Sequence, residues 1–96
     1  MQCTLSPLAE EDLEDIGDYI ARDNPTRAIS FVRDIRERCA KIAAVPMAAP
    51  LCPELAEDVR MIIFGQYLIF YTVEAEEIRV ERILHGARNI RYLFDA

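Results

Sequence analysis

Three short apolar runs in the second half of the chain are rich in β-branched and aromatic side chains, a pattern typical of β-strands. They span Met61–Phe64, Tyr67–Val73 and Ile78–Leu84. Within Tyr67–Val73 both alternating sets of side chains are largely apolar, so we expect a central strand that is covered on both faces. Near the N-terminus, Gln2–Leu5 is a further short stretch that could add an edge strand to the same sheet.

The last of these runs contains a polar break. Its more apolar alternating set is Ile78, Val80, Arg82 and Leu84. A buried arginine without a partner is costly, so we expect Arg82 to pair with a carboxylate or to open into a groove. The run leads into Leu84-His85-Gly86-Ala87-Arg88, where the only histidine, a glycine and an arginine occur together. We therefore expect the working surface at the end of this strand.

Apolar positions in the first half recur at helical spacing and predict two helices. Ser6-Pro7 supplies an N-cap followed by proline at the first helical position, and Asn24-Pro25 repeats that signal. The two stripes are Ala9, Leu13, Ile16 and Ile20, and then Ala28, Phe31, Val32, Ile35, Cys39 and Ile42. Because the link between the helices is short, we expect an antiparallel helical hairpin.

The polar face of the first helix carries Glu11, Asp15 and Asp18. We interpret these side chains as a solvated acidic face, and an acidic catalytic pair is the alternative. Basic side chains of the second helix, from Arg33 to Lys41, are interpreted in the same way.

The region between the helices and the strands is stiff, because Pro46–Pro53 contains three prolines. The helical hairpin can cover one face of the sheet, and the chain has no third long helix for the other face. Only Asn89–Phe94, an amphipathic stretch too short to be a stable helix alone, follows the last strand. We therefore expect an apolar sheet face rimmed by arginine, which is typical of a surface for a protein partner.

Length and charge narrow the function classes. The 96 residues predict a single domain over 1–96 with a thin core. The net charge of −6 argues against a general nucleic-acid binder. The excess of acidic side chains lies in the first part of the chain, which contains the two predicted helices. Residues 1–58 hold 12 acidic and 6 basic side chains, whereas residues 59–96 hold five of each.

Cysteine usage points to a cytoplasmic protein with reduced thiols. Cys3, Cys39 and Cys52 have no metal-type spacing, and one histidine is too few for a zinc site, so we expect no metal and no cofactor. The N-terminus lacks the pattern of a signal peptide, and no apolar run is long enough to span a membrane.

A set of motifs runs through nearly the whole chain. The first part consists of Ser6-Pro7-x-Ala9-x-x-Asp12-Leu13, Ile16, Tyr19-Ile20 and Asn24-Pro25. The more specific part consists of Arg60, Gly65-x-Tyr67-x-Ile69-Phe70-Tyr71 and Arg82-Ile83-Leu84-His85-Gly86-Ala87-Arg88. In this order the motifs resemble the ParE branch of the ParE/RelE toxin superfamily. The resemblance implies an α+β fold of β-α-α-β-β-β order with a short final helix, in which a helical hairpin packs on one face of an antiparallel sheet.

The resemblance also implies a function. ParE-like proteins are toxins of type II toxin–antitoxin modules that inhibit DNA gyrase without being enzymes. A ParD-like antitoxin neutralises such a toxin by laying a helix and a strand along its sheet. The antitoxin's own domain contacts DNA, so no sequence-specific DNA binding is expected of this chain. We expect contacts with the target or the antitoxin from Arg60, Tyr67, Tyr71, Arg82, His85, Arg88 and Arg91.

Two alternatives remain open from the sequence. The first is a ribosome-dependent mRNA endoribonuclease like RelE, which would need a base, an acid and cations around the reacting phosphate. Its candidate residues are Arg60, Arg82, His85, Arg88 and Tyr92. Against it, the only lysine, Lys41, lies in the second helix, so a cationic cluster for RNA is missing. The second alternative is an inert member that only binds its antitoxin.

Overall fold

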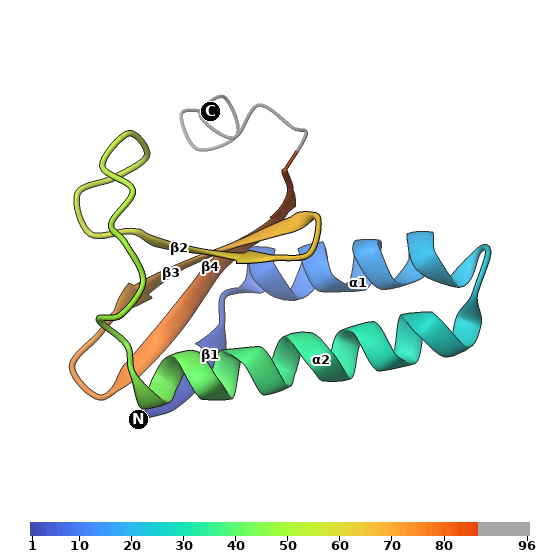
Figure 1. Ribbon diagram of the computed structural model, residues 1–96, viewed down its shortest axis with the longest axis horizontal. Helices are drawn as coiled ribbons and strands as arrows, with labels where there is room; N and C mark the ends of the chain where they lie inside the picture. Colours follow the sequence, from blue (N-terminus) through green and yellow to red (C-terminus); the bar gives the residue numbers. More distant parts are fainter. Residues whose placement is uncertain (87–96) are drawn as a thin grey trace.

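The computed structural model describes residues 1–86, which form two helices and four strands (Figure 1). In chain order these are β1 (Gln2–Leu5), α1 (Pro7–Ala21), α2 (Pro25–Ala44), β2 (Arg60–Phe64), β3 (Tyr67–Val73) and β4 (Glu77–His85). The predicted order and class are confirmed, with strand ends shifted by one residue at most. The short final helix predicted at Asn89–Phe94 lies outside the described residues, as do Arg88, Arg91 and Tyr92.

Both helices begin where the sequence predicts. The hydroxyl of Ser6 accepts a hydrogen bond from the backbone N–H of Ala9, and Pro7 opens α1. The side chain of Asn24 likewise accepts from the N–H of Arg27 at the start of α2. These caps satisfy N–H groups that have no partner inside a helix, and they therefore fix where each helix begins.

The sheet has the order β1-β4-β3-β2. The central strand β3 runs antiparallel to both β2 and β4. The predicted wholly antiparallel sheet is wrong at one edge, because β1 runs parallel to β4 from Gln2 opposite Glu77 to Leu5 opposite Val80. The sheet is therefore mixed. A four-residue strand carries no pattern that fixes its direction, so a parallel pairing could not be predicted from the residues of β1.

A tight two-residue turn joins β2 to β3. Gly65 has a φ angle of 59°, in the left-handed region that glycine tolerates best. This geometry suits a hairpin loop of two residues and sets Phe64 opposite Tyr67.

The helical hairpin packs on one face of the sheet and forms the main core (Figure 1). Fully buried side chains from α2 and from the two central strands, β3 and β4, meet there: Ile35, Cys39, Ile69, Tyr71, Ile78, Val80 and Ile83. Burial of these apolar surfaces is the main source of stability for a chain of this size.

A β-bulge in β4 changes which side chains face the helices. Phe70 pairs with Arg82, whereas Tyr71 pairs with Val80, so Glu81 is the extra residue. As a result Ile83 joins Val80 in the main core, and Leu84 packs on the other face. The simple alternation predicted for this strand is therefore wrong after Val80, because the bulge shifts the side-chain phase by one residue.

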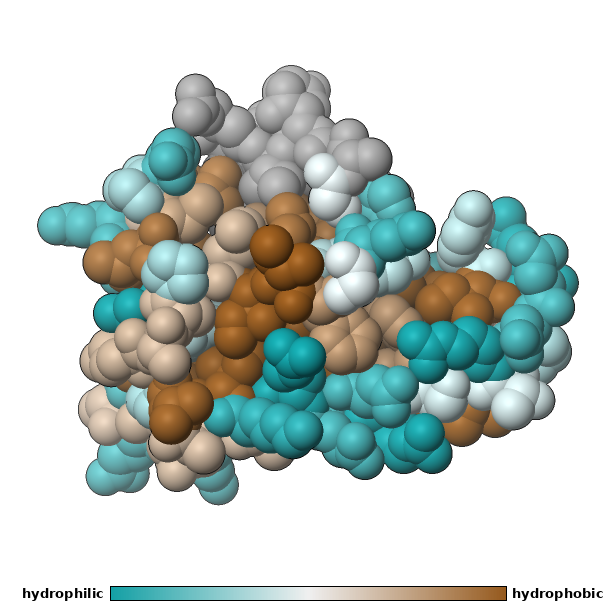
Figure 2. Space-filling model, viewed as in Figure 1, coloured by the Kyte–Doolittle hydropathy of each residue, from teal (hydrophilic) through white to brown (hydrophobic). Residues whose placement is uncertain are grey.

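The second face of the sheet is covered in part, contrary to the prediction of a bare face. Phe70 and Leu84 are buried against Val59, the last residue of the connector, the segment 45–59 between α2 and β2. The connector folds back over the sheet, and its Leu55 packs on this cluster. Figure 2 shows the apolar side chains that gather over the sheet and the connector, beside the more hydrophilic outer surfaces of the helices. Ile63 of β2 stays 65% exposed, so only part of this face is open.

Candidate functional site: a pocket between the first helix and the ends of two strands

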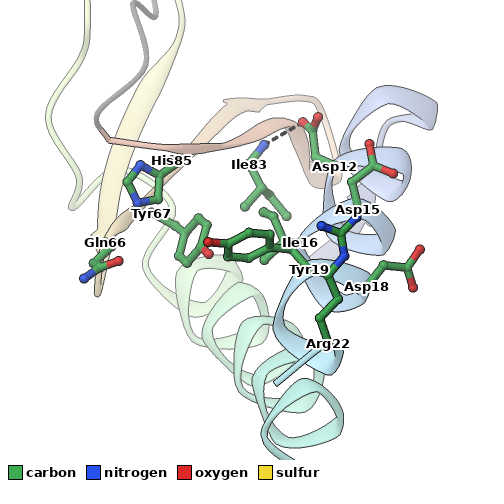
Figure 3. A pocket seen from close by; sticks show the side chains of 10 residues that line it. All are labelled: Asp12, Asp15, Ile16, Asp18, Tyr19, Arg22, Gln66, Tyr67, Ile83 and His85. Carbon is green, nitrogen blue, oxygen red and sulfur yellow. Dashed lines mark hydrogen bonds between the residues drawn. The ribbon is translucent and has the colours of Figure 1, made fainter. Parts of the chain in front are cut away.

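A cavity of about 660 Å³ lies between α1 and the adjacent ends of β3 and β4, next to the hairpin turn that joins β2 to β3 (Figure 3). Its walls come from the second half of α1, from the hairpin turn and from the two strands. The lining residues are Asp12, Asp15, Ile16, Asp18, Tyr19, Arg22, Gln66, Tyr67, Ile83 and His85. A pocket of this size can take a side chain or a short segment of a partner.

One wall of the pocket is aromatic. The rings of Tyr67 and His85 meet edge to face, with centroids 5.4 Å apart. Tyr67 is held from behind by Phe31 of α2 at 5.1 Å, so its ring is fixed by the core. Tyr19 faces this pair from α1 and is 65% exposed (Figure 3). The pocket therefore offers both a rigid and an exposed aromatic surface.

The opposite wall is acidic and is anchored by Asp12. Its carboxylate accepts two hydrogen bonds from the guanidinium of Arg82, at 2.7 and 2.9 Å, and a third from the backbone N–H of Ile83 at 3.0 Å (Figure 3). The prediction that Arg82 pairs with a carboxylate is confirmed. The hydrogen bonds to Asp12 raise the pKa of Arg82, while burial acts in the opposite direction.

The local sequence explains this anchor. β1 ends at Leu5, opposite Val80, so within residues 1–86 the later part of β4 pairs with β3 on one side and has no strand on the other side, where Asp12 of α1 contacts it. An exposed edge N–H needs an acceptor, and Asp12 supplies one. The hydrogen bonds of Asp12 to Arg82 and Ile83 therefore hold α1 next to the end of β4.

The charge of the lining is negative. Three aspartates, Asp12, Asp15 and Asp18, face one arginine, Arg22, and one histidine, His85. Asp12 is already neutralised by Arg82, so Asp15 and Asp18 provide the available negative charge. Such a surface attracts cationic groups and repels phosphate.

Two residues predicted as contact sites hold the connector instead. Arg60 donates hydrogen bonds to the carbonyl oxygens of Met47 and Ala49, at 3.3 and 2.6 Å. Tyr71 is fully buried, and its hydroxyl donates to the carbonyl oxygen of Pro46 at 2.8 Å. In this structure both side chains stabilise the fold of the connector, and the ring of Tyr71 is not accessible to a partner.

Of the seven predicted contact residues, the structure brings Tyr67 and His85 together at the pocket. Arg82 turns away to Asp12, and Arg88 and Arg91 lie outside the described residues. The nuclease candidates are dispersed in the same way, since Arg60 and Arg82 are engaged in separate structural contacts and Tyr92 is not described.

The sequence analysis missed the contribution of α1. Asp15, Asp18, Tyr19 and Arg22 were assigned to a solvated face or given no role, whereas they form one side of the pocket. The available signal was Tyr19, a large aromatic side chain on an otherwise charged face of the helix. The sequence did not show that the end of β4 lies opposite this face.

Metal binding and membrane insertion find no support in the described residues. Among residues 1–86, no three histidine, cysteine, aspartate or glutamate side chains are grouped so that they could hold a metal ion. Neither of the two described helices combines the length and apolar character needed to cross a bilayer.

Comparisons with known proteins agree with this architecture. A family model described as the ParE toxin of type II toxin-antitoxin system, parDE, matches residues 4–90. Toxin ParE1 of Mycobacterium tuberculosis, from strains CDC 1551 / Oshkosh and ATCC 25618 / H37Rv, is 32% identical over 88 residues, covering 90% of this chain and 90% of the relative. A solved structure of the chromosomal ParDE TA system from P. aeruginosa has the same fold, with a TM-score of 0.75 and 24% identity over 88% of this chain and 95% of that chain. The chain therefore belongs to the family of ParE toxins of type II toxin–antitoxin systems.

Proposed function

We propose that this ParE-family toxin acts by binding DNA gyrase in the cytoplasm, without catalysing a reaction, and that a ParD-like antitoxin neutralises it. The family match over residues 4–90 carries the proposal, because it spans both helices and the strands β2, β3 and β4. The structural relative comes from a ParDE system, which supports an antitoxin partner for this chain.

The charge of the pocket supports a protein target over RNA. An endoribonuclease must bind a phosphate backbone and stabilise a more negative transition state, which calls for several cations. Among the described lining residues are His85, three aspartates and a single arginine, Arg22. Arg60 and Arg82 cannot make up the deficit, because carbonyl oxygens and Asp12 already occupy them.

The aromatic side chains are the proposed anchor for a partner. Tyr19, Tyr67 and His85 line the pocket, and the ring of Tyr67 is fixed between His85 and Phe31. Aromatic residues with restricted rings contribute strongly at interfaces, because little side-chain entropy is lost on binding. We therefore place a contact with gyrase or the antitoxin at this pocket.

The edge strand β2 is a second contact surface that fits the antitoxin. Within residues 1–86, Arg60 bridges Leu51, and the rest of the outer edge of β2 has no strand beside it. Ile63 projects from the same strand and is 65% exposed. An extended antitoxin segment could pair with this edge and cover Ile63, as in other complexes formed by strand addition.

A supercoiling assay with purified gyrase tests the proposal. We expect the toxin to inhibit supercoiling and the cognate antitoxin to restore it, while ribosome-bound mRNA remains intact. Cleavage of that mRNA without inhibition of gyrase would establish the nuclease alternative. A chain that binds its antitoxin but affects neither process would be an inert member of the family.

A further inference from the structure

Two cysteine thiols meet where β1 packs on α2. Cys3 lies in the edge strand and is half-buried, whereas Cys39 lies in the helix and is 2% exposed. Cys3 packs against the core cluster that contains Cys39. A hollow of about 350 Å³ opens beside them, lined by both cysteines and by Arg36. A small oxidant can therefore reach the pair from solvent.

The surroundings shift the pKa values of the two thiols in opposite directions. The side chain of Cys39 lowers the pKa of Cys3, and the positive charge of Arg36 acts in the same direction, against burial and Glu77. The side chain of Cys3 and burial raise the pKa of Cys39. Cys3 therefore loses its proton more readily than Cys39, and the thiolate is the form that reacts with oxidants.

We propose that Cys3 and Cys39 form a peroxide-sensitive pair that closes an intramolecular disulfide between β1 and α2. In the first step the Cys3 thiolate attacks hydrogen peroxide, which gives a sulfenic acid and hydroxide. In the second step the sulfur of Cys39 attacks that sulfenic acid, and the disulfide forms as water leaves with the thiol proton. Both sulfur atoms are oxidised together by two electrons, and one peroxide is reduced to water.

The position of this pair indicates what the disulfide would do. Cys3 stands opposite Ile78 in the parallel β1–β4 pairing, and Cys39 lies in the main core. A bond between them would connect the edge strand to the helix across the whole of α1, which limits separation of β1 from the fold. Neither cysteine lines the larger pocket, so oxidation should leave its surface unchanged. This inference rests on the fold alone and is independent of the proposed target.

The third cysteine provides an internal control. Cys52 lies in the connector, and its thiol donates a hydrogen bond to the carboxylate of Glu54 at 3.4 Å. Burial and this neighbouring negative charge raise the pKa of Cys52, so it remains a protonated thiol. Peroxide should therefore act on Cys3 in preference to Cys52.

The test treats the purified full-length chain with hydrogen peroxide, then blocks remaining thiols with an alkylating agent after unfolding. We expect one alkylated cysteine, Cys52, a mass lower by two hydrogen atoms before alkylation, and a proteolytic peptide that joins Cys3 to Cys39. Dithiothreitol should restore all three thiols. The melting temperature should rise on oxidation and return on reduction.

Variants separate the proposal from general oxidation. Cys52→Ser should still form the linked peptide, whereas Cys3→Ser should abolish it and remove the rise in melting temperature. Cys39→Ala should leave a sulfenic acid at Cys3 that dimedone labels, a result that distinguishes the attacking from the resolving sulfur. If Cys39→Ala does not fold, the linked peptide and thiol count of the unmodified sequence still decide the question. Three free thiols after peroxide, or linkage through Cys52, would overturn the proposal.

Discussion

The carboxylate of Asp12 joins α1 to β4 through Arg82, with nitrogen–oxygen distances of 2.7 and 2.9 Å. The same carboxylate accepts from the N–H of Ile83, one residue further along the strand. Both ends of the ion pair are mostly buried, with side-chain exposures of 19% and 13%. This arrangement combines a bidentate ion pair with an edge hydrogen bond, and it positions the acidic wall of the pocket.

Replacing Asp12 by alanine should therefore destabilise the fold strongly. The change leaves the guanidinium of Arg82 and the N–H of Ile83 without their acceptor, which should lower the free energy of unfolding by about 2–4 kcal/mol. Asp12→Asn keeps one acceptor oxygen and should cost less. Urea denaturation followed by circular dichroism measures both changes.

The exposed pair of Glu10 in α1 and Arg36 in α2 is the matched control. Its side chains are 53% and 52% exposed, so Glu10→Ala should change the free energy of unfolding by less than about 0.5 kcal/mol. Equal losses for Asp12→Ala and Glu10→Ala would mean that the buried geometry of the first pair contributes nothing.

The N-cap of α1 should matter more than the N-cap of α2. The hydroxyl of Ser6 accepts from Ala9 and also donates to the carbonyl oxygen of Glu81, the bulged residue of β4, at 2.8 Å. Ser6→Ala removes both bonds at a buried site and should cost about 2 kcal/mol. Asn24→Ala removes one exposed bond and should cost about 1 kcal/mol. Thermal unfolding of both variants tests this order, and a larger loss for Asn24→Ala would contradict it.

Local chemistry explains what could be predicted about the fold. The residue pairs Ser6-Pro7 and Asn24-Pro25 mark both helix starts, because capping depends on neighbouring residues alone. β3 was predicted with its observed bounds, since two apolar faces fit a central strand. The carbonyl oxygen of Glu81, the extra residue of the bulge, accepts a hydrogen bond from Ser6, 75 residues earlier in the chain, and no local pattern marks the bulge.

The candidate site was harder to predict because it is assembled from distant segments. Tyr67 and His85 share a strand pairing and could be expected to meet. The acidic side of the pocket comes from α1, whose Asp12 contacts β4 through Arg82 and the backbone N–H of Ile83. The sequence predicts that Arg82 needs a carboxylate but does not identify which one. The connector contacts of Arg60 and Tyr71 also join separate segments of the chain and were not predicted.

Tyr71 should make stability depend on pH in the alkaline range. Burial raises its pKa above the usual value of 10.0, and Arg60 only partly opposes this. A raised pKa in the folded state means that the stability is fully present below the pKa of the unfolded chain and is lost as pH rises above about 10. Tyr71→Phe should therefore reduce the fall in stability above that pH.

The exposed Tyr19 supplies the control for this measurement. Tyr19→Phe makes the same chemical change at a residue that is 65% exposed, so it reports what the loss of a hydroxyl does at the surface of the fold. The variants are compared with the parent chain by urea denaturation between neutral pH and pH values above 10. If the free energy of unfolding falls equally with pH in Tyr71→Phe and in the parent chain, then Tyr71 is not the source of the alkaline loss of stability.

Arg88 should contribute more to toxicity than His85. Arginine forms bidentate contacts with carboxylates on a protein partner, whereas His85 already packs on Tyr67 and lines an acidic pocket. We expect Arg88→Ala to weaken binding to the partner by about tenfold, which corresponds to about 1.4 kcal/mol, and to raise the inducer concentration needed for growth inhibition. His85→Ala should have a smaller effect. Full toxicity of both variants, with neutralisation retained, would place the working surface elsewhere.

Reversing the charge of the pocket should weaken partner binding without unfolding the toxin. Asp18 lines the pocket, whereas Glu14 of the same helix faces a separate hollow next to Val32 and Arg36. Asp18→Arg should therefore lower affinity for gyrase or the antitoxin by about tenfold or more, because it adds positive charge opposite a cationic partner surface. Glu14→Arg makes the same charge change on the other side of the helix and should leave affinity nearly unchanged. Isothermal titration at two salt concentrations compares them, and equal losses for both variants would show that net charge, and not this pocket, determines binding.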